Sequence, residues 1–125
     1  MMAKILLVNL TGQMAGAEQS LFLLARYLGN HFRLTVACPK PSPLADRLEM
    51  LGITTLKLPA YPEYKLLSIN GLYYFIRILL VLLKLILTHR PDLVHANTFA
   101  ALGRVALPAR LVGKPIIAHA RDFHR

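Results

Sequence analysis

The apolar positions of the chain fall into short continuous runs and longer stretches with helical spacing. The first run, Lys4–Leu10, is short, apolar and bounded by turn residues, which predicts a strand buried on both faces as in a parallel sheet. Leu21, Leu24 and Leu28 then follow the spacing of one helix face. We therefore predict a helix from about Ala17 to Leu28.

The same criteria predict the rest of the chain. A proline at position 108 predicts a kink or an early end of the last helix. Ser42 is expected to cap the second helix, in front of a proline at its first turn. The further elements, in chain order, are strand Phe32–Cys38, helix Leu44–Leu51, strand Ile53–Leu58, helix Leu66–Leu87, strand Leu93–Ala96, helix Thr98–Val112 and strand Ile116–His119.

Strict alternation of strands and helices is typical of an α/β fold. We expect one Rossmann-like, three-layer domain over residues 1–125, with a mostly parallel sheet and strand order 3-2-1-4-5. This order puts the topological switch point between the first and fourth strands. The loop Leu10–Gly16 should therefore face Asn97–Phe99, with His119–Asp122 beside them.

Charge indicates an anionic partner. Lys and Arg number 15 against 6 Asp and Glu, which gives a net charge of +9. The basic residues are spread out and not interleaved with aromatics, so nucleic acid is the least favoured of the three anionic partners, behind a phosphorylated small molecule and a membrane surface. The single cysteine, Cys38, is expected to be a reduced core residue of a cytoplasmic protein. The first residues lack the features of a secretory signal.

The helix predicted over Leu66–Leu87 contains the longest apolar stretch. Arg77 and Lys84 interrupt it, which disfavours a membrane span. On a helical projection these two cations share a narrow polar stripe with Asn70, Tyr73 and Thr88. Two interpretations stay open: a helix that covers the sheet, and a helix whose excess apolar flank rests on a membrane interface, with Tyr73, Tyr74, Arg77 and Lys84 as the interface candidates.

The turn Ala15-Gly16-Ala17-Glu18 joins the first strand to the first helix. Such a junction presents backbone N–H groups and the positive end of the helix dipole, so it is a candidate anion site. The turn matches neither the P-loop nor the dinucleotide-binding glycine pattern, and an ordinary turn would have the same composition. Asn97 and Thr98 follow the fourth strand, where they could cap the next helix or contact a ligand.

The end of the fifth strand carries an imidazole, a guanidinium and a carboxylate within four residues. His119 and Arg121 share one face by alternation, while Arg121 and Asp122 could form a surface ion pair. His95, inside the fourth strand, is expected to be a hydrogen-bonded core residue. No group of side chains has the spacing of metal ligands.

With these residues located, the chain resembles the N-terminal domain of glycosyltransferase family 4, which has the two-domain GT-B architecture. Four features occur in the family's order. They are the strand followed by Met14-Ala15-Gly16-Ala17-Glu18-Gln19-Ser20, similar to the family's Gly-Gly-Ala-Glu turn; Pro91-Asp92-Leu93-Val94-His95-Ala96-Asn97-Thr98; Gly113-Lys114-Pro115-Ile116-Ile117; and His119 with Arg121-Asp122. Ala15 departs from the pattern, because the family's first glycine is usual at this position.

The resemblance implies retaining transfer of a sugar from a nucleotide sugar, without a cofactor or metal. It implies that Gly16, with Ala15 and Ala17, approaches the donor phosphates and that His119 acts as the catalytic-site histidine on the donor sugar. Asn97, Thr98, Arg121 and Asp122 are then acceptor or switch-point candidates.

The resemblance covers only the family's acceptor-side half. The donor domain, with its nucleotide pocket and Glu-x7-Glu motif, has no counterpart in these 125 residues. We therefore expect no turnover by the chain alone, and expect a C-terminal domain or partner subunit to complete it.

The acceptor is expected to be a glycan or lipid-linked, and the location cytoplasmic or peripheral on the membrane's cytoplasmic face. The alternative is a non-catalytic, membrane-proximal binding or scaffold subunit of a split transferase. The sugar, nucleotide and acceptor are not specified by the sequence.

Overall fold

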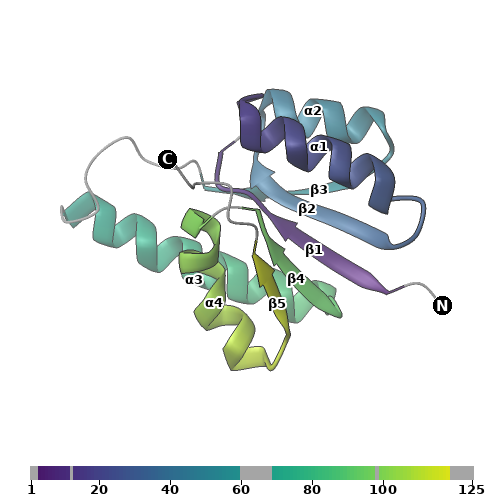
Figure 1. The fold of residues 1–125 in the computed structure, drawn as a ribbon. Helices are drawn as coiled ribbons and strands as arrows, with labels where there is room; N and C mark the ends of the chain where they lie inside the picture. Colours follow the sequence, from purple (N-terminus) through teal and green to yellow (C-terminus); the bar gives the residue numbers. More distant parts are fainter. Residues whose placement is uncertain (1–2, 12, 60–68, 98, 119–125) are drawn as a thin grey trace, which may run out of the picture.

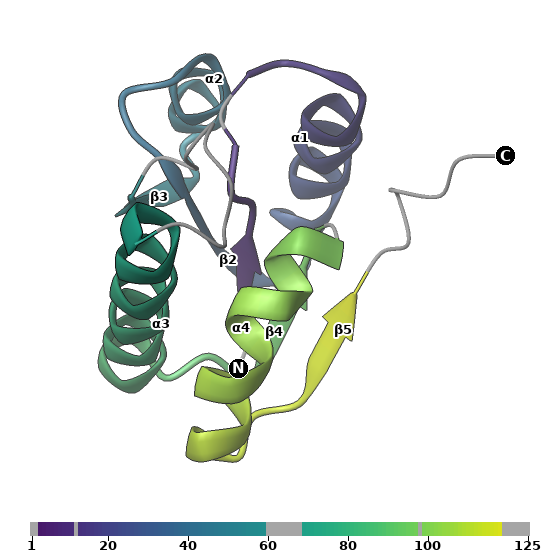
Figure 2. The ribbon, with the colours of Figure 1, turned by 90° about the vertical axis from the view of Figure 1, so that its left-hand side faces the viewer.

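The chain folds into a three-layer α/β sandwich. A computed structural model describes residues 3–11, 13–59, 69–97 and 99–118. Helices cover both faces of a twisted sheet (Figures 1 and 2). The elements in chain order are β1 (Lys4–Val8), α1 (Gly16–Leu28), β2 (Arg33–Pro39), α2 (Pro43–Met50), β3 (Thr54–Leu58), α3 (Ile69–His89), β4 (Leu93–Ala96), α4 (Phe99–Val112) and β5 (Ile116–Ala118).

The sheet has the predicted strand order. Its five strands lie in the order β3-β2-β1-β4-β5, and every neighbouring pair is parallel. Val8, the last residue of β1, is in register with Ala37 on one side and Ala96 on the other. The carboxyl ends of β1 and β4 therefore lie side by side, which confirms the predicted switch point.

Each face of the sheet has its own apolar core, which explains why β1 is apolar at successive positions. Leu6 and Val8 point to the side of α3 and α4, whereas Ile5 and Leu7 point to the side of α1 and α2. All four side chains are buried. Continuous burial of this kind requires helices on both faces, as the sequence predicted.

The first strand ends earlier than predicted, whereas α4 does not end early at Pro108 and reaches the predicted Val112. The first strand ends at Val8 and not at Leu10, although Leu10 is only 3% exposed and belongs to the core. The apolar character of Leu10 therefore indicates burial in the core and not hydrogen-bonded pairing within the strand. Pro108 does not end α4, which continues to Val112. Val105 and Ala109 are fully buried around the proline, and this packing offsets the lost backbone hydrogen bond.

Capping of α2 follows the sequence prediction. Ser42 Oγ accepts a hydrogen bond from the Ala45 N–H at 3.2 Å, with Pro43 in the first turn. The residue after the helix end, Gly52, has a φ of 81°, which only glycine adopts without strain. The sequence order of serine, proline and glycine thus sets both ends of the helix.

Helix α3 covers the sheet, as one of the two open interpretations predicted. Its residues Leu72–His89 are long and apolar enough to cross a membrane by length and composition alone. In the fold, however, Tyr74, Ile78 and Ile86 form part of its buried stripe against the sheet. Tyr74 is 5% exposed and contributes to the core, so it is not available as an interface residue and that prediction is wrong. The predicted residues Leu66–Ser68 lie outside the described part of the chain.

Candidate functional site

Two asparagines join the neighbouring strands of the switch point. Asn9 follows β1 and Asn97 follows β4, and each backbone N–H extends the sheet ladder by one bond, to the Ala37 and Val8 carbonyls at 3.0 Å each. The Asn97 Nδ2 group donates to Asn9 Oδ1 at 2.9 Å. Both side chains are buried, at 0% and 1% exposure. Asn97 is thereby bonded to the residue that directly precedes the predicted loop Leu10–Gly16.

Glu18 completes a buried polar network at the same edge. Its Oε2 atom accepts hydrogen bonds from Asn9 Nδ2 at 2.7 Å and from the Thr11 hydroxyl at 2.5 Å. Asn9 Nδ2 also donates to the Thr11 carbonyl at 2.6 Å. The carboxylate is only 3% exposed, so it points into the domain. The first turn of α1 is thereby attached to the ends of both central strands.

Sequence reasoning missed this network, because it treated Glu18 only as a member of the turn Ala15-Gly16-Ala17-Glu18. A usable signal was present. Asn9 ends a fully buried strand, Thr11 follows it closely, and Glu18 opens the helix that returns over that strand. A carboxylate in the first turn beside two short polar side chains has partners close enough to be buried.

The amino end of α1 is left open on its outer side. Ala15 is the N-cap residue and its side chain makes no capping hydrogen bond. A Cβ atom built on Gly16 meets no atom within 4 Å, and its φ is not in the left-handed region. Neither backbone conformation nor packing therefore requires a glycine at position 16. Among the described residues of this edge, the exposed N–H end of the helix is the group whose chemistry suits an anion.

Several predicted site residues lie outside the described part of the chain. They are Thr98, His119, Arg121 and Asp122, for which the predicted roles stay predictions. Ala17 lies in the first turn of α1 beside Gly16. The described residues thus supply the α1 turn and the Asn97 side of the predicted site.

A buried cation lies between α3 and α4. Arg104 is 8% exposed, and its guanidinium carbon lies 5.4 Å from the centre of the Phe75 ring. This cation–π contact joins the two helices on their inner sides. An arginine among apolar residues of a helix predicts solvent exposure, so the sequence held no signal for the contact. His95 is 6% exposed in β4, which confirms the predicted core position.

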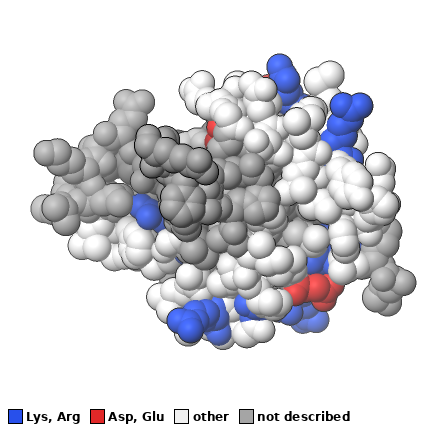
Figure 3. Space-filling view, in the orientation of Figure 1, with Lys and Arg blue, Asp and Glu red and all other residues white. Residues whose placement is uncertain are grey.

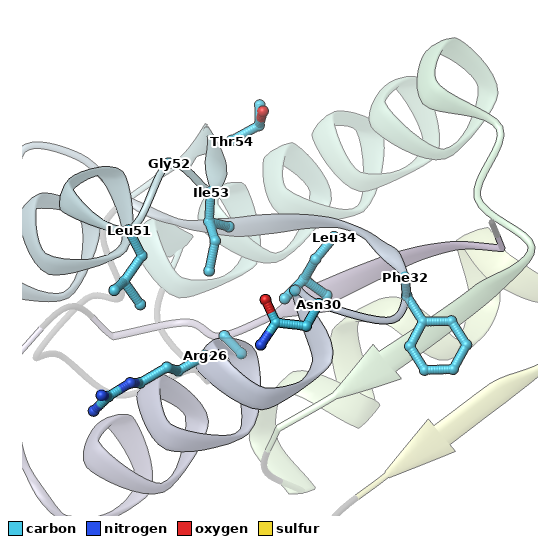
Figure 4. Close-up of a pocket in the computed structure, with 10 residues that line it drawn as sticks. Arg26, Asn30, Phe32, Leu34, Leu51, Gly52, Ile53 and Thr54 are labelled. Atoms are coloured by element: carbon cyan, nitrogen blue, oxygen red, sulfur yellow. The ribbon is translucent and has the colours of Figure 1, made fainter.

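The larger cavities lie at the opposite edge of the sheet. One of about 370 Å³ lies between the end of α1 and the start of β3 and is lined by Arg26, Asn30 and Thr54 among others (Figure 4). Another of about 430 Å³ is lined by Lys4, Arg33 and other residues where β1 and β2 begin. Both cavities are at the amino ends of the strands. Ligands of open α/β sheets bind at the opposite, carboxyl ends, at the switch point.

The described residues offer neither a metal site nor a reactive thiol. Within them, no group of three or more His, Cys, Asp or Glu side chains could hold a metal ion. Cys38 is fully buried, as predicted. Burial raises the pKa of its thiol to about 11, an effect that the nearby Lys40 charge only partly opposes. The thiol is therefore not a nucleophile at neutral pH.

Three solved structures illustrate how widely this fold is used. HepE from Anabaena, in complex with UDP-glucose, is 23% identical with a TM-score of 0.72 and matches 95% of this chain over 29% of its own. MurG from Acinetobacter baumannii is 12% identical with a TM-score of 0.73, over 94% and 35% of the two chains. The C-terminal domain of a hydrogenase from Pyrococcus furiosus is 18% identical with a TM-score of 0.68, over 93% and 89%.

At these identities the structural likenesses show the fold alone. The chain spans 29% of the length of HepE, so it corresponds to a domain-sized part of that protein. None of the curated protein sequences matches the chain significantly.

The sequence itself decides the family. Residues 14–124 match Glycosyltransferase Family 4, which covers the α1 turn, Asn97 and the segment that ends at His124. The Rossmann-like sheet with order 3-2-1-4-5 agrees with the GT-B glycosyltransferases among the similar structures. The chain therefore belongs to Glycosyltransferase Family 4.

Proposed function

We propose that the chain is the acceptor-side, N-terminal domain of a retaining glycosyltransferase that takes its sugar from a nucleotide sugar. Family membership and the UDP-glucose complex of the similar HepE structure support the reaction class. The observation that carries the site is the open amino end of α1, with a glycine at position 16 that the fold does not need.

In this reaction the bond between the anomeric carbon and the diphosphate oxygen breaks. A new bond forms to an acceptor hydroxyl oxygen on the same face of the sugar, and the hydroxyl proton passes to the leaving diphosphate. Negative charge develops on the leaving diphosphate, and the N–H groups at Gly16 and Ala17 would stabilise it without a metal ion. His119 would contact the donor sugar, and Asn97, Thr98, Arg121 and Asp122 would line the acceptor side.

Turnover in this proposal needs a second, donor-binding part, supplied by a longer chain or a partner subunit. The chain spans 29% of HepE, a protein that was crystallised with a nucleotide sugar. We therefore expect the 125-residue chain alone to release no UDP from UDP-sugars, and the protein that joins it to its donor-binding part to do so with EDTA present. Ordinary turnover by the chain alone, or none by the joined protein with any nucleotide sugar, would overturn the proposal.

Gly16→Val tests the role of the α1 turn in the joined protein. A side chain at this position meets nothing inside the domain, so it should leave the fold intact but obstruct close approach of the donor phosphates. We expect KM for the nucleotide sugar to rise by roughly tenfold or more.

Gly103→Val is the matched control for this substitution. Gly103 is an exposed glycine of α4 whose Cβ position is equally open. Its variant should keep the KM of the unmodified protein. Equal effects of the two substitutions would show that valine acts through the helices and not through the donor.

A second candidate function is a binding subunit of a split transferase, without catalysis of its own. The favouring observation is that the chain corresponds to only 29% of HepE. Genomic sequence separates the two candidates. A reading frame that continues past Arg125 into a donor domain with Glu-x7-Glu supports the enzyme, whereas a separate gene for that domain supports the subunit.

A further inference from the structure

Helices α3 and α4 leave a continuous apolar surface uncovered on the outside of the domain. The stripe of α3 that faces the sheet is narrow, and large apolar side chains on its far side are exposed. We call this surface the α3–α4 apolar face; its exposed members are Leu72, Ile76, Leu80, Leu87, Leu107 and Leu111. Leu80 and Leu111 are 62% and 68% exposed. Contiguous apolar surface of this kind marks an interaction site.

A shallow groove runs along this face where the two helices meet. It has a volume of about 190 Å³ and is lined only by apolar side chains of α3 and α4, among them Leu83 and Pro108. Both views of the ribbon show α3 and α4 side by side on one face of the sheet (Figures 1 and 2). The apolar surface is therefore shared by two helices and does not belong to one exposed side chain.

The Lys and Arg residues of α3 and α4 and of the turn after α4 give this face a positive charge. Arg77 and Lys84 lie on α3 beside its exposed apolar stripe, and Arg110 and Lys114 lie at the end of α4. Neither helix contains an Asp or Glu. In the space-filling view, blue Lys and Arg atoms lie along the lower edge, where Figure 1 places the end of α4, and one red acidic group lies beside them (Figure 3).

We propose that the α3–α4 apolar face rests on the surface of an anionic phospholipid membrane, with α3 lying in the plane of the interface. Apolar side chains would enter the headgroup and acyl boundary, while the flanking cations extend their stems toward the lipid phosphates. This inference does not depend on sugar transfer. It would place a family member with this surface next to membrane-borne acceptors.

Charge favours lipid over a second copy of the chain. In a symmetric dimer the same patch meets itself, so Arg77, Lys84 and Arg110 of one copy would approach the same cations of the other. Such like charges repel, and neither helix offers an acidic partner. An anionic membrane neutralises all of them at once.

A tryptophan reporter tests the contact directly, because the chain has no tryptophan of its own. Leu80→Trp places the indole on the α3–α4 apolar face. Leu23→Trp, on α1, is the matched control, since both leucines are 62% exposed. With phosphatidylglycerol–phosphatidylcholine vesicles at low ionic strength, we expect a blue shift and quenching by brominated lipid for position 80 only. Equal quenching at both positions would refute the orientation.

Charge variants test the second half of the proposal. Arg77→Gln with Lys84→Gln should weaken sedimentation with vesicles by about fivefold per residue, and added salt should weaken it further. Arg26→Gln with Arg47→Gln removes the same charge from the helices on the other side of the sheet and should have a smaller effect. Circular dichroism checks that each variant folds, which is expected because the Arg77 and Lys84 side chains are exposed.

Three results would overturn the proposal. The first is no sedimentation of the chain with anionic vesicles at low salt. The second is a dimer without lipid that Leu80→Asp dissociates, which would assign the face to a second copy. The third is vesicle binding by the 125-residue chain but not by a longer protein that contains it, which would assign the face to a further part of that protein. Failure of sugar transfer leaves these measurements unaffected, so the two proposals fail separately.

Discussion

Replacing Glu18 by alanine should lower the free energy of unfolding by about 2 kcal/mol. The variant removes the Oε2 atom at which Asn9 and Thr11 both donate, at 2.7 and 2.5 Å. The cost is not the sum of two charged hydrogen bonds. Asn9 keeps its bond to the Thr11 carbonyl, and Thr11 is exposed enough to turn its hydroxyl to water. One charge-assisted bond, worth about 2 kcal/mol, is therefore lost outright.

Two further effects of this substitution nearly cancel. Removal of one buried methylene group costs about 0.8 kcal/mol in burial. The alanine variant, however, no longer removes a carboxylate from water, which returns a similar amount. The net value corresponds to a shift of about thirtyfold in the folding equilibrium, which is easily measured.

Glu18→Gln separates the hydrogen bonds from the charge. Because both donors meet at one oxygen, the glutamine amide oxygen can accept both bonds, and the loss should be about 1 kcal/mol or less. Gln19→Ala, at the exposed next position, should change stability by less than about 0.5 kcal/mol. Urea unfolding followed by circular dichroism gives all three values. An alanine variant as stable as the unmodified chain, or a glutamine variant as unstable as the alanine one, would refute the reasoning.

Two further predictions concern β2 and α2. Cys38, fully buried and with a pKa of about 11, should react with a thiol reagent at mildly alkaline pH only after unfolding in urea, and rapid labelling of the folded chain would contradict its burial. Hydrogen bonds from Lys40 and Thr55 hold the pKa of Glu49 below its ordinary value of 4.5. The stability advantage of the unmodified chain over Glu49→Gln should therefore be complete above that pH and disappear as the pH falls through the lowered pKa, as unfolding at a series of pH values would show. An advantage that is independent of pH would exclude the ion pair as its cause.

Apolar spacing predicted the elements because burial on both faces of a parallel sheet leaves a plain pattern, and the strict alternation of strands and helices predicted the strand order. It could not locate where β1 stops, since Leu10 is buried without being paired. It could not reveal the Arg104 contact with Phe75, because an isolated arginine in a helix has the pattern of an exposed residue. The order of strands and loops along the chain predicted that candidate ligand-binding residues lie at the switch point. The hydrogen-bond partners of Glu18, however, depend on how the loop after β1 folds back over the strand.

The hydrogen bond between Asn97 and Asn9 joins residues 88 positions apart. During synthesis, the α1 turn leaves the ribosome long before β4 has been made. Asn9 therefore cannot form its hydrogen bond with Asn97 until much later. Correct geometry at the amino end of α1 therefore depends on the second half of the domain having been synthesised and docked. A chain interrupted before β4 would carry the family's glycine turn without the arrangement that holds it.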